Sequence, residues 1–277
     1  MAYLQISPAF HLRNYVRHFW IIKNEVNEVM PKVLGPLADG CHGILFQPAE
    51  DGYFFGRHNK KIPELCLHGQ TLTETSLILE GSFNTFGVCF KPNALKILFN
   101  IDANELTDDC LDLAALKSAR DYYLCEKLHY ATTSKEKINI MSDYLFHLVN
   151  KNENSHDWVT GRAISLLTQP GLMPDLSILQ KDLCLSGRSI ERKFKEHVGI
   201  SPHLFLRITR FNFALNQLQT NNYNLLSDIA FDNGYADQAH FIREFKLYTG
   251  LSPFQFKKQT KLSVLPLYNE SEKSKAI

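Results

Sequence analysis

Apolar positions in the second half of the chain recur at helical spacing in two separate places. Residues three or four positions apart lie on one face of an α-helix, so the two runs predict helices near 187–198 and 237–248, each with one buried stripe. The stripes consist of Ile190, Phe194 and Val198 in the first helix and of Phe241, Phe245 and Tyr248 in the second.

The two predicted helices belong to one sequence repeat. Arg192 and Arg243 stand 51 positions apart. The same offset relates Phe194 to Phe245, Gly199 to Gly250, Pro202 to Pro253 and Phe205 to Phe256. In each copy a glycine ends the helix and a Ser-Pro pair opens the next one, because glycine accepts the left-handed conformation and proline fits the first helical turn. A constant offset over several residue types indicates an internal duplication.

The outward faces of the two helices carry the candidate chemistry. Arginine and glutamine can bond base edges in a major groove, lysine can contact phosphate, and an exposed isoleucine can touch a thymine methyl group. A solvated surface would explain either face alone, but two such faces in the same register favour DNA recognition. The candidate DNA-binding residues are Arg188, Glu191, Arg192 and Lys195 in the first helix and Gln238, Ala239, Ile242, Arg243 and Lys246 in the second.

A shorter apolar segment precedes each of these helices, at 176–183 and at 226–231. A short helix, a tight turn and a longer helix with a polar face form a helix-turn-helix, whose second helix enters the major groove. Gly234 suits the second turn, whereas Cys184 occupies that region in the first. Between the units, 201–219 is predicted as one helix about 28 Å long, which suits two helices that read successive grooves about 34 Å apart.

The stretch from about 158 to 258 resembles the tandem helix-turn-helix DNA-binding domain of AraC/XylS-type transcriptional regulators. The matching residues are Asp228-Ile229-Ala230, Gly234-Tyr235, Asp237-Gln238, Phe241, Arg243, Phe245-Lys246, Gly250 and Ser252-Pro253, with Arg210, Ala214 and Leu218 in the linking helix. The resemblance implies a seven-helix domain in which the outward positions of both reading helices contact bases. Two positions depart from the family pattern, Gln180 where alanine is usual and Ala236 where a capping serine is common.

The first half of the chain is rich in β-branched and aromatic runs bounded by Gly, Pro, Asn and Asp, which predict strands. The predicted strands are 15–23, 43–47, 76–80 and 85–90, followed by a helix from Pro92 through Leu98, a turn into further helix at 101–108, and a helix at 134–149 capped by Ser134. The predicted fold class is α+β, with an N-terminal β-rich domain (a sheet or barrel plus helices) followed by an all-α seven-helix domain with two helix-turn-helix units.

A polar segment at 150–156 has no apolar period and is predicted to link the two domains, which we place at 1–150 and 156–261. The first of them resembles a widespread, uncharacterised domain found in front of AraC-type DNA-binding domains. The matching signatures lie at 15–20, 39–41, 69–70, 87–92 and 105–108, with Ala38 in place of the usual proline. The resemblance implies that this domain binds a small-molecule effector, dimerises, or does both.

Charge is unevenly distributed along the chain. The net charge is +1, but 176–261 holds 12 Lys and Arg against 7 Asp and Glu, so the region of the repeat is positive as nucleic-acid binding requires. The six cysteines form no CxxC pair and are predicted to be reduced thiols, and no membrane span or signal peptide is recognisable. These features predict a cytoplasmic protein with no membrane partner.

Several groups in the first half invite a chemical role, but each has a plainer explanation. Cys66 and His68, with His42 and His58, lack the second spaced pair of a metal site, and Asp39 beside Cys41 and His42 lacks an orienting group and an oxyanion loop. Two sets of apolar residues leave alternatives open, because strand aromatics can form core or line a ligand pocket, and a helical stripe can pack on its own sheet or form a dimer seam. These sets are Phe54, Phe55, Phe83, Phe86 and Phe90, and Ile138, Met141, Leu145 and Leu148.

Taken together, these patterns predict a sequence-specific, double-stranded DNA-binding transcription factor, either activator or repressor, with no catalytic residue, cofactor or metal. Its expected partners are an operator DNA and RNA polymerase, with a small-molecule effector or a second copy of the chain as candidates for the first domain. Two alternatives stay open: an enzyme or small-molecule binder with an appended helical domain, and a DNA-silent regulator that acts by heterodimerisation.

Overall fold

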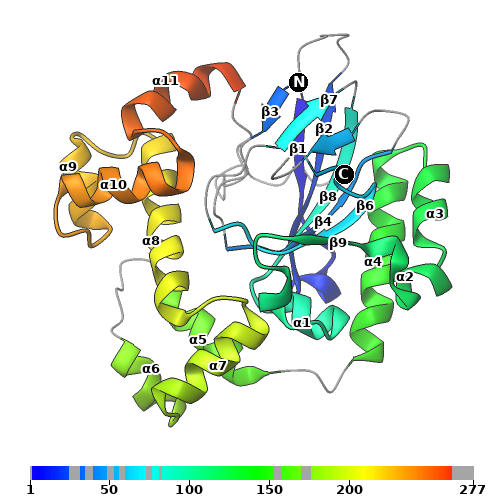
Figure 1. The fold of residues 1–277 in the computed structure, drawn as a ribbon, viewed down its shortest axis with the longest axis horizontal. Coiled ribbons are helices and arrows are strands. Elements are labelled where there is room, and N and C mark those ends of the chain that lie inside the picture. Colours follow the sequence, from blue (N-terminus) through cyan, green and yellow to red (C-terminus); the bar gives the residue numbers. More distant parts are fainter. Residues whose placement is uncertain are drawn as a thin grey trace.

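The computed structural model shows an N-terminal half built on β-sheet and a C-terminal half built of helices (Figure 1). The predicted α+β fold class is therefore confirmed. The residues that the structure describes are 2–24, 32–34, 40–48, 53–55, 60–72, 77–80, 83–152, 157–169 and 176–263. Ala38, Asp39 and His58, residues 153–156 of the predicted linker and the tail beyond 263 lie outside these ranges.

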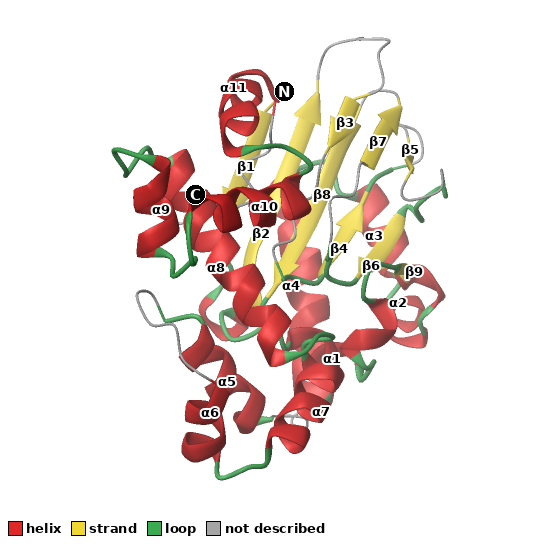
Figure 2. Ribbon diagram, turned by 60° about the vertical axis from the view of Figure 1, so that its left-hand side comes forward, coloured by secondary structure: helices red, strands yellow, loops and turns green. Residues whose placement is uncertain are grey.

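The N-terminal half contains two sheets whose described strands all pair in antiparallel fashion (Figure 2). The larger sheet has the order β1 (Ala2–Ile6), β2 (Val16–Asn24), β8 (Phe83–Phe90), β4 (Gly43–Phe46), β6 (Leu65–His68) and β9 (Cys110–Asp112). The smaller sheet has the order β3 (Lys32–Leu34), β7 (Leu77–Glu80) and β5 (Tyr53–Phe55). Several strands that lie side by side in these sheets, such as β2 and β8, are therefore distant in sequence.

Both faces of the larger sheet are buried around its central strands, and successive side chains of a strand point to opposite faces. On one face Ile44 lies opposite Val88, and both belong to the main core of this half. On the other face Leu45 lies opposite Cys66, and both pack with Phe54 of β5 in a separate cluster. Since Phe54 comes from the smaller sheet, the two sheets face each other across this cluster.

Helices cover the face of the larger sheet that carries Ile44 and Val88. They are α1 (Ala94–Phe99), α2 (Lys117–Asp121), α3 (Leu124–Tyr130) and α4 (Ser134–Lys151), with single 3₁₀ turns at η1 (Phe10–Leu12), η3 (Ala103–Leu106) and η4 (Leu113–Ala115). In α4, Met141, Leu145 and Leu148 are buried in the same core as the sheet. The stripe of this helix therefore packs on its own domain, which leaves it unavailable as a dimer seam.

The N-cap of α4 is Thr133 rather than the predicted Ser134. Thr133 Oγ1 accepts a hydrogen bond from the Glu136 backbone N–H at 3.2 Å, and the Glu136 carboxylate accepts one from the Thr133 N–H at 3.0 Å. Two backbone donors of the first turn are satisfied in this capping box, and a serine one position later has no equivalent geometry.

The four predicted strands correspond to β2, β4, β7 and β8, while five further strands were not predicted. The missed strands have three to five residues, too few to display a clear alternation. The turn predicted at 101–108 leads into further helix only after an unpredicted strand, because η3 ends at Leu106 and the chain turns through Asp108, at φ 59°, into β9 before it reaches η4 and α2. Pairing with β6 along the edge of the larger sheet supplies the backbone hydrogen bonds that a helix would otherwise make.

The C-terminal half has seven helices in the described residues, the number implied by the family resemblance. They are α5 (Trp158–Leu167), α6 (Leu176–Leu183), α7 (Gly187–His197), α8 (Pro202–Gln219), α9 (Leu226–Asp232), α10 (Gln238–Thr249) and α11 (Pro253–Ser263). One continuous core runs through them. No described helix is both long enough and apolar enough to cross a membrane.

The two halves are in direct contact at the end of α7. Gln70 Nε2 donates to the Val198 carbonyl oxygen at 2.5 Å, and Thr107 Oγ1 donates to the Gly199 carbonyl oxygen at 3.2 Å. Leu72 also packs against the core of the C-terminal half. Two polar side chains of the first half thus satisfy the carbonyl groups that α7 leaves unpaired at its end.

Gly199 should be intolerant of a side chain, because it has φ 89° and an added Cβ would lie within 2.9 Å of Gln70 Nε2, Thr107 Oγ1 and the Ala103 carbonyl oxygen. We expect Gly199→Ala to lower the free energy of unfolding by about 1–3 kcal/mol. Gly161→Ala is the matched control, because its Cβ would meet no atom closer than 3.9 Å and alanine favours helix. Urea unfolding followed by circular dichroism compares the two variants, and equal stabilities would contradict this account of the contact.

Two buried histidines should make the first half sensitive to acid. Burial, aided by Arg17 and by His68 respectively, lowers the pKa of His18 from 6.5 to about 4 and that of His42 from 6.5 to about 3. Neutral imidazole therefore stabilises the fold fully above about pH 6.5, and this stabilisation is lost as the pH falls through the folded values. We expect the urea midpoint to fall less steeply between about pH 6.5 and 4 in His18→Gln than in the parent. His203→Gln, at an exposed position, should leave the slope unchanged.

Candidate nucleic-acid interface

The first helix-turn-helix consists of α6 and α7. The turn between them contains Cys184 in the left-handed region at φ 52°, a conformation that glycine would adopt at lower cost. Ser186 caps α7, since its Oγ accepts from the Ser189 N–H at 3.3 Å. Ile190 and Phe194 are buried as predicted. The outward face of α7 is thereby fixed by a cap at one end and by an apolar stripe along its length.

The predicted residues of α7 line one cleft together with residues of the first half. Arg188, Glu191, Arg192 and Lys195 are all exposed on the same side of the helix. The complete lining is Arg188, Ser189, Glu191, Arg192, Lys195 and Glu196 of α7 with Asp102 and Asn104 from the segment at η3. Sequence reasoning missed Ser189, Glu196, Asp102 and Asn104, because no sequence pattern relates η3 to a helix far along the chain.

An ion-pair bridge holds this cleft at one edge. Lys96 of α1 contacts Glu196 of α7 at 3.5 Å and also forms an ion pair with Asp102. The hydrogen bond from Lys96 to Asp102 raises the pKa of Lys96 against the opposing effect of its partial burial, and the charge of Glu196 adds to this rise. Lys96 of the first half therefore connects α7 to the Asp102 carboxylate. That carboxylate lines the same cleft as the basic side chains of α7.

The side of α7 that faces α5 is held by Asp157. Its carboxylate accepts a hydrogen bond from Thr160 at 2.6 Å and contacts Lys193 Nζ at 3.2 Å and His197 Nε2 at 3.3 Å. Burial by itself would raise the pKa of Asp157, but these hydrogen bonds and charges hold it below its usual value. Burial lowers the pKa of His197, despite the opposing charges of Asp157 and Glu196. Asp157 also caps α5, so one carboxylate fixes two helices relative to each other.

The second helix-turn-helix consists of α9 and α10, with Gly234 at φ 67° in the turn. Asp237, rather than the neighbouring Ala236, is the N-cap of α10, and its Oδ1 accepts from the His240 N–H at 2.6 Å. The departure from the family's capping serine at Ala236 is thus compensated by a cap one residue later. The other departure, Gln180 in α6, is exposed and does not disturb the packing of that helix.

The predicted residues of α10 differ in how far they reach into solvent. Ile242 is half-buried and packs partly against the core. The remaining four, which are exposed, are Gln238, Ala239, Arg243 and Lys246. Within the described residues, Arg188, Arg192 and Arg243 form no ion pair with any other side chain, so their guanidinium donors face solvent or the cleft. The groups that could hydrogen-bond bases on both helices are accordingly available.

A buried carboxylate fixes α10 on α8. Glu244, whose side chain is 5% exposed, accepts from Arg207 Nε at 2.7 Å and from Arg210 Nη2 at 2.9 Å. The Arg210 guanidinium also lies over the Tyr235 ring, 4.4 Å from its centroid. Because Glu244 follows Arg243 directly, this inward anchor sets the orientation of the outward arginine. Sequence reasoning missed Glu244, although Arg210 was among the matching family positions.

One helix, α8, joins the two reading helices. Phe205 of α8 packs edge-on against Phe194 of α7 with ring centroids 5.9 Å apart, and Phe211 packs against Phe245 of α10 at 5.6 Å. The 18 residues of α8 give it a length of about 27 Å. Successive major grooves on one side of B-DNA are about 34 Å apart, so two helices on a spacer of this length can address neighbouring grooves.

Several of the groups discounted from the sequence are buried in the described part of the chain. His42 is fully buried beside His68, and Cys66 and Cys41 are buried in the sheet region. Phe86 and Phe90 belong to the core under the helices, while Phe54 packs between the sheets. The side chains of Phe55 and Phe83 lie outside the described residues. The described aromatic side chains of this set therefore belong to the hydrophobic core.

Family models match both halves of the chain. Residues 4–112 match a domain of unknown function (DUF6597), and residues 179–259 match a helix-turn-helix domain. A transcriptional regulator of Haemophilus influenzae, described as an uncharacterized HTH-type regulator, is 33% identical over 118 residues, which are 43% of this chain and 37% of that protein. The ornithine utilization regulator of Pseudomonas aeruginosa is 34% identical over 92 residues, 33% of this chain and 26% of that one. The chain thus spans about a third or less of the length of these relatives.

Solved structures with a related arrangement include ToxT from Vibrio cholerae, which has a TM-score of 0.47 and 14% identity and covers 86% of this chain and 97% of its own. The DNA-binding domain of AdpA, in complex with a target DNA, has a TM-score of 0.32 and 22% identity, over 38% of this chain and 92% of its own. These overlaps are too low for residues of either structure to be matched to positions in this chain.

The ion pairs of Glu244 lead to a stability prediction. Glu244→Ala leaves Arg207 and Arg210 without their buried partner, and removal of one member of a buried pair costs about 3–5 kcal/mol. We expect a loss of this size in the free energy of unfolding. Glu105→Ala, at an exposed position on η3, should change it by less than about 0.5 kcal/mol. Urea unfolding provides the comparison, and a loss at Glu244 no larger than that at Glu105 would show that the ion pairs contribute little.

Proposed function

We propose that this chain is an AraC/XylS-type helix-turn-helix regulator with a DUF6597 domain in front, and that it is a sequence-specific double-stranded DNA-binding transcription factor that reads successive major grooves with α7 and α10. The observation that carries this proposal is the presence of two exposed polar helix faces, in the same sequence register, fixed to one core by α8. A core shared by both helices presents them together, as recognition of two adjacent half-sites requires.

The proposed contacts follow from the chemistry of each side chain. Arginine pairs with the O6 and N7 atoms of guanine, glutamine with adenine, and glutamate accepts from the cytosine amino group, while small or apolar side chains touch the thymine methyl group. Lysine positions the protein on phosphate. We propose that bases are contacted by Arg188, Glu191 and Arg192 of α7 and by Gln238, Ala239, Ile242 and Arg243 of α10. Phosphate groups are contacted by Lys195 and Lys246.

The first half is proposed to control access to α7. Asp102 and Asn104 line the same cleft as the base-contacting residues, so DNA entering the groove-reading side of α7 meets a carboxylate and the body of the first half. Phosphate and carboxylate repel each other, which disfavours DNA binding in this arrangement. The first half can cover α7 or leave it uncovered, and an effector or partner that binds the uncovered arrangement more tightly would favour that arrangement. It would thereby raise operator affinity, to an extent set by the difference between its affinities for the two arrangements.

For the whole protein, we propose a cytoplasmic location and no enzymatic activity. We propose that it acts on RNA polymerase at the operator. A small-molecule effector and a second copy of the chain are the candidate partners of the first half. The domain boundaries at 1–150 and 156–261 stay predictions. The contacts of Gln70 and Thr107 with α7 support a regulatory role for the first half rather than that of an independent enzyme.

The base-reading role of Arg243 is tested with DNA selected from a random pool by the intact chain. Arg243→Ala should weaken binding to the selected sequence by about 1–3 kcal/mol and relax base preference at the positions that α10 contacts. Arg120→Ala, which removes the same charge from the first half, should leave the affinity within about twofold. Electrophoretic mobility shift at fixed salt measures both variants.

Unchanged affinity and base preference in Arg243→Ala would contradict the assignment of that residue. If the intact chain enriched no sequence at all, the DNA-reading proposal would give way to a DNA-silent regulator or an enzyme. Selection with Arg243→Ala alongside the parent separates these outcomes, because the parent shows whether any sequence is read and the variant shows which helix reads it.

The regulatory role of the first half has its own test. Asp102→Asn removes the carboxylate that faces the basic side chains of α7 and also breaks the ion pair with Lys96. We expect operator affinity to rise about three- to tenfold, which corresponds to about 0.6–1.4 kcal/mol. Asp121→Asn on α2 makes the same charge change away from the cleft and should have a smaller effect. An equal rise in both variants would mean that net charge, not the cleft, controls binding.

A further inference from the structure

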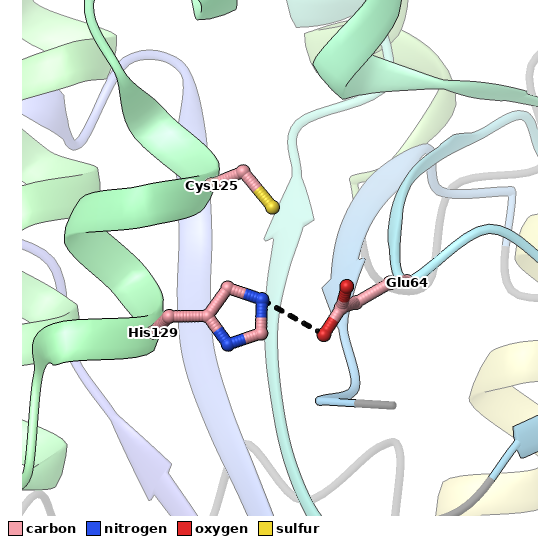
Figure 3. A group of neighbouring side chains, drawn as sticks. All are labelled: Glu64, Cys125 and His129. Atoms are coloured by element: carbon pink, nitrogen blue, oxygen red, sulfur yellow. Dashed lines mark ion pairs between the residues drawn. The ribbon is translucent and has the colours of Figure 1, made fainter. Parts of the chain in front are cut away.

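Three side chains of the first half converge beside α3 (Figure 3). Cys125 and His129 are one helical turn apart on α3, so they project from the same side of the helix. Glu64 comes from the residue directly before β6, on the adjoining segment. The thiol sulfur, an imidazole nitrogen and a carboxylate oxygen all lie within 4.8 Å of one another, and His129 Nε2 is 3.0 Å from Glu64 Oε1.

We propose that Glu64, Cys125 and His129 bind a divalent transition-metal ion, for which Zn²⁺ is the best fit. Zinc in proteins is held by cysteine sulfur, histidine nitrogen and carboxylate oxygen in tetrahedral geometry, and a site with three protein ligands keeps its fourth position for water or another ligand. The mixture of a soft thiolate with imidazole also disfavours Mg²⁺ and Ca²⁺, which prefer all-oxygen ligands. The chemistry of the three donors therefore selects the class of ion.

The geometry is compatible with closure around an ion. Metal–ligand bonds of about 2.0–2.3 Å at tetrahedral angles put neighbouring ligand atoms about 3.5 Å apart. Rotation of the Glu64 and Cys125 side chains can take up the difference from the present separations, since neither requires backbone movement for a shift of about 1 Å. The His129 and Phe46 rings pack in a T-shaped arrangement, with centroids 5.4 Å apart and planes at 85°. The imidazole points toward Glu64 (Figure 3).

The electrostatic surroundings favour a cation. The carboxylates of Glu64, Glu126 and Asp112 lie near the Cys125 thiol. Their negative charges attract a metal ion, whose two positive charges offset them. On binding, the Cys125 S–H bond breaks, the sulfur forms a bond to the metal, and the proton passes to solvent. The half-exposed His129, with its side chain 38% exposed, leaves a route for the ion to enter.

This site was not predicted from the sequence, in which Cys66 and His68 are the candidate metal ligands that were discounted. The spacing of Cys125 and His129 on one helix is a signal that could have been found, but Glu64 lies far from them in sequence and carries no such signal. Within the part of the chain that the structure describes, these three residues are the group of His, Cys, Asp or Glu whose donor atoms come close enough to share an ion. The inference is independent of the proposed function, because it concerns a site remote from α7 and α10.

The test is a titration of the reduced, full-length protein with Co²⁺, which occupies zinc sites and reports its ligands by absorption. We expect saturation at one Co²⁺ per chain, a sulfur-to-cobalt charge-transfer band, tetrahedral d–d bands, and loss of all of them on addition of Zn²⁺. Cys125→Ser should abolish the charge-transfer band. Glu64→Gln and His129→Gln should weaken Co²⁺ binding at least about tenfold, since even groups that only support a metal ligand contribute about 10- to 100-fold to affinity.

Cys184→Ser is the matched control, because Cys184 is an exposed thiol in the other half of the chain. It should retain the parent's spectrum and affinity. Circular dichroism confirms that each variant is folded, and Zn²⁺ should raise the thermal midpoint of the parent and of Cys184→Ser but not that of Cys125→Ser. Absence of a charge-transfer band in the parent, or its persistence in Cys125→Ser, would overturn the proposal and leave Glu64 and His129 as an ion pair only.

Discussion

The packing of α8 against both α7 and α10 is the interaction on which the arrangement of the C-terminal half depends. Phe205 and Phe211 of α8 hold Phe194 and Phe245 of the two reading helices, and all four belong to one core. Because protein interiors are close-packed, neither helix can rotate about its axis without opening this core. The outward residues therefore inherit their positions from buried ones, and the buried Glu244 adds a polar constraint on α10.

Contacts with the first half also constrain α7. That helix is held by its apolar stripe, by Asp157 on one side, and by Gln70 and Thr107 at its C-terminal end. The second reading helix, α10, has no comparable contact with the first half in the described residues, so the two helices differ in their exposure to regulation. The proposed control thus acts on α7 alone. Because α8 connects α7 rigidly to α10, this control would affect binding to any operator that requires both helices.

Much of the C-terminal half could be predicted because its signals are local. The apolar stripes, Gly199, Gly250 and the Ser-Pro pairs each specify a helix face or a helix end within a few residues, and the repeat showed them twice. Contacts between distant segments could not be predicted in this way. The cleft residue Asp102 and the arginine partners of Glu244 depend on tertiary packing, and short edge strands such as β9 form only because a neighbour is already present.

We infer that one rigid core presents two reading helices to neighbouring major grooves. Methylation protection of the selected DNA sequence tests it most directly, because it reports guanine N7 atoms covered in the major groove. We expect two protected clusters about one helical turn apart on the same side of the duplex. We also expect Arg192→Ala to remove protection from one cluster and Arg243→Ala from the other. A single protected cluster, or loss of the same cluster in both variants, would contradict it.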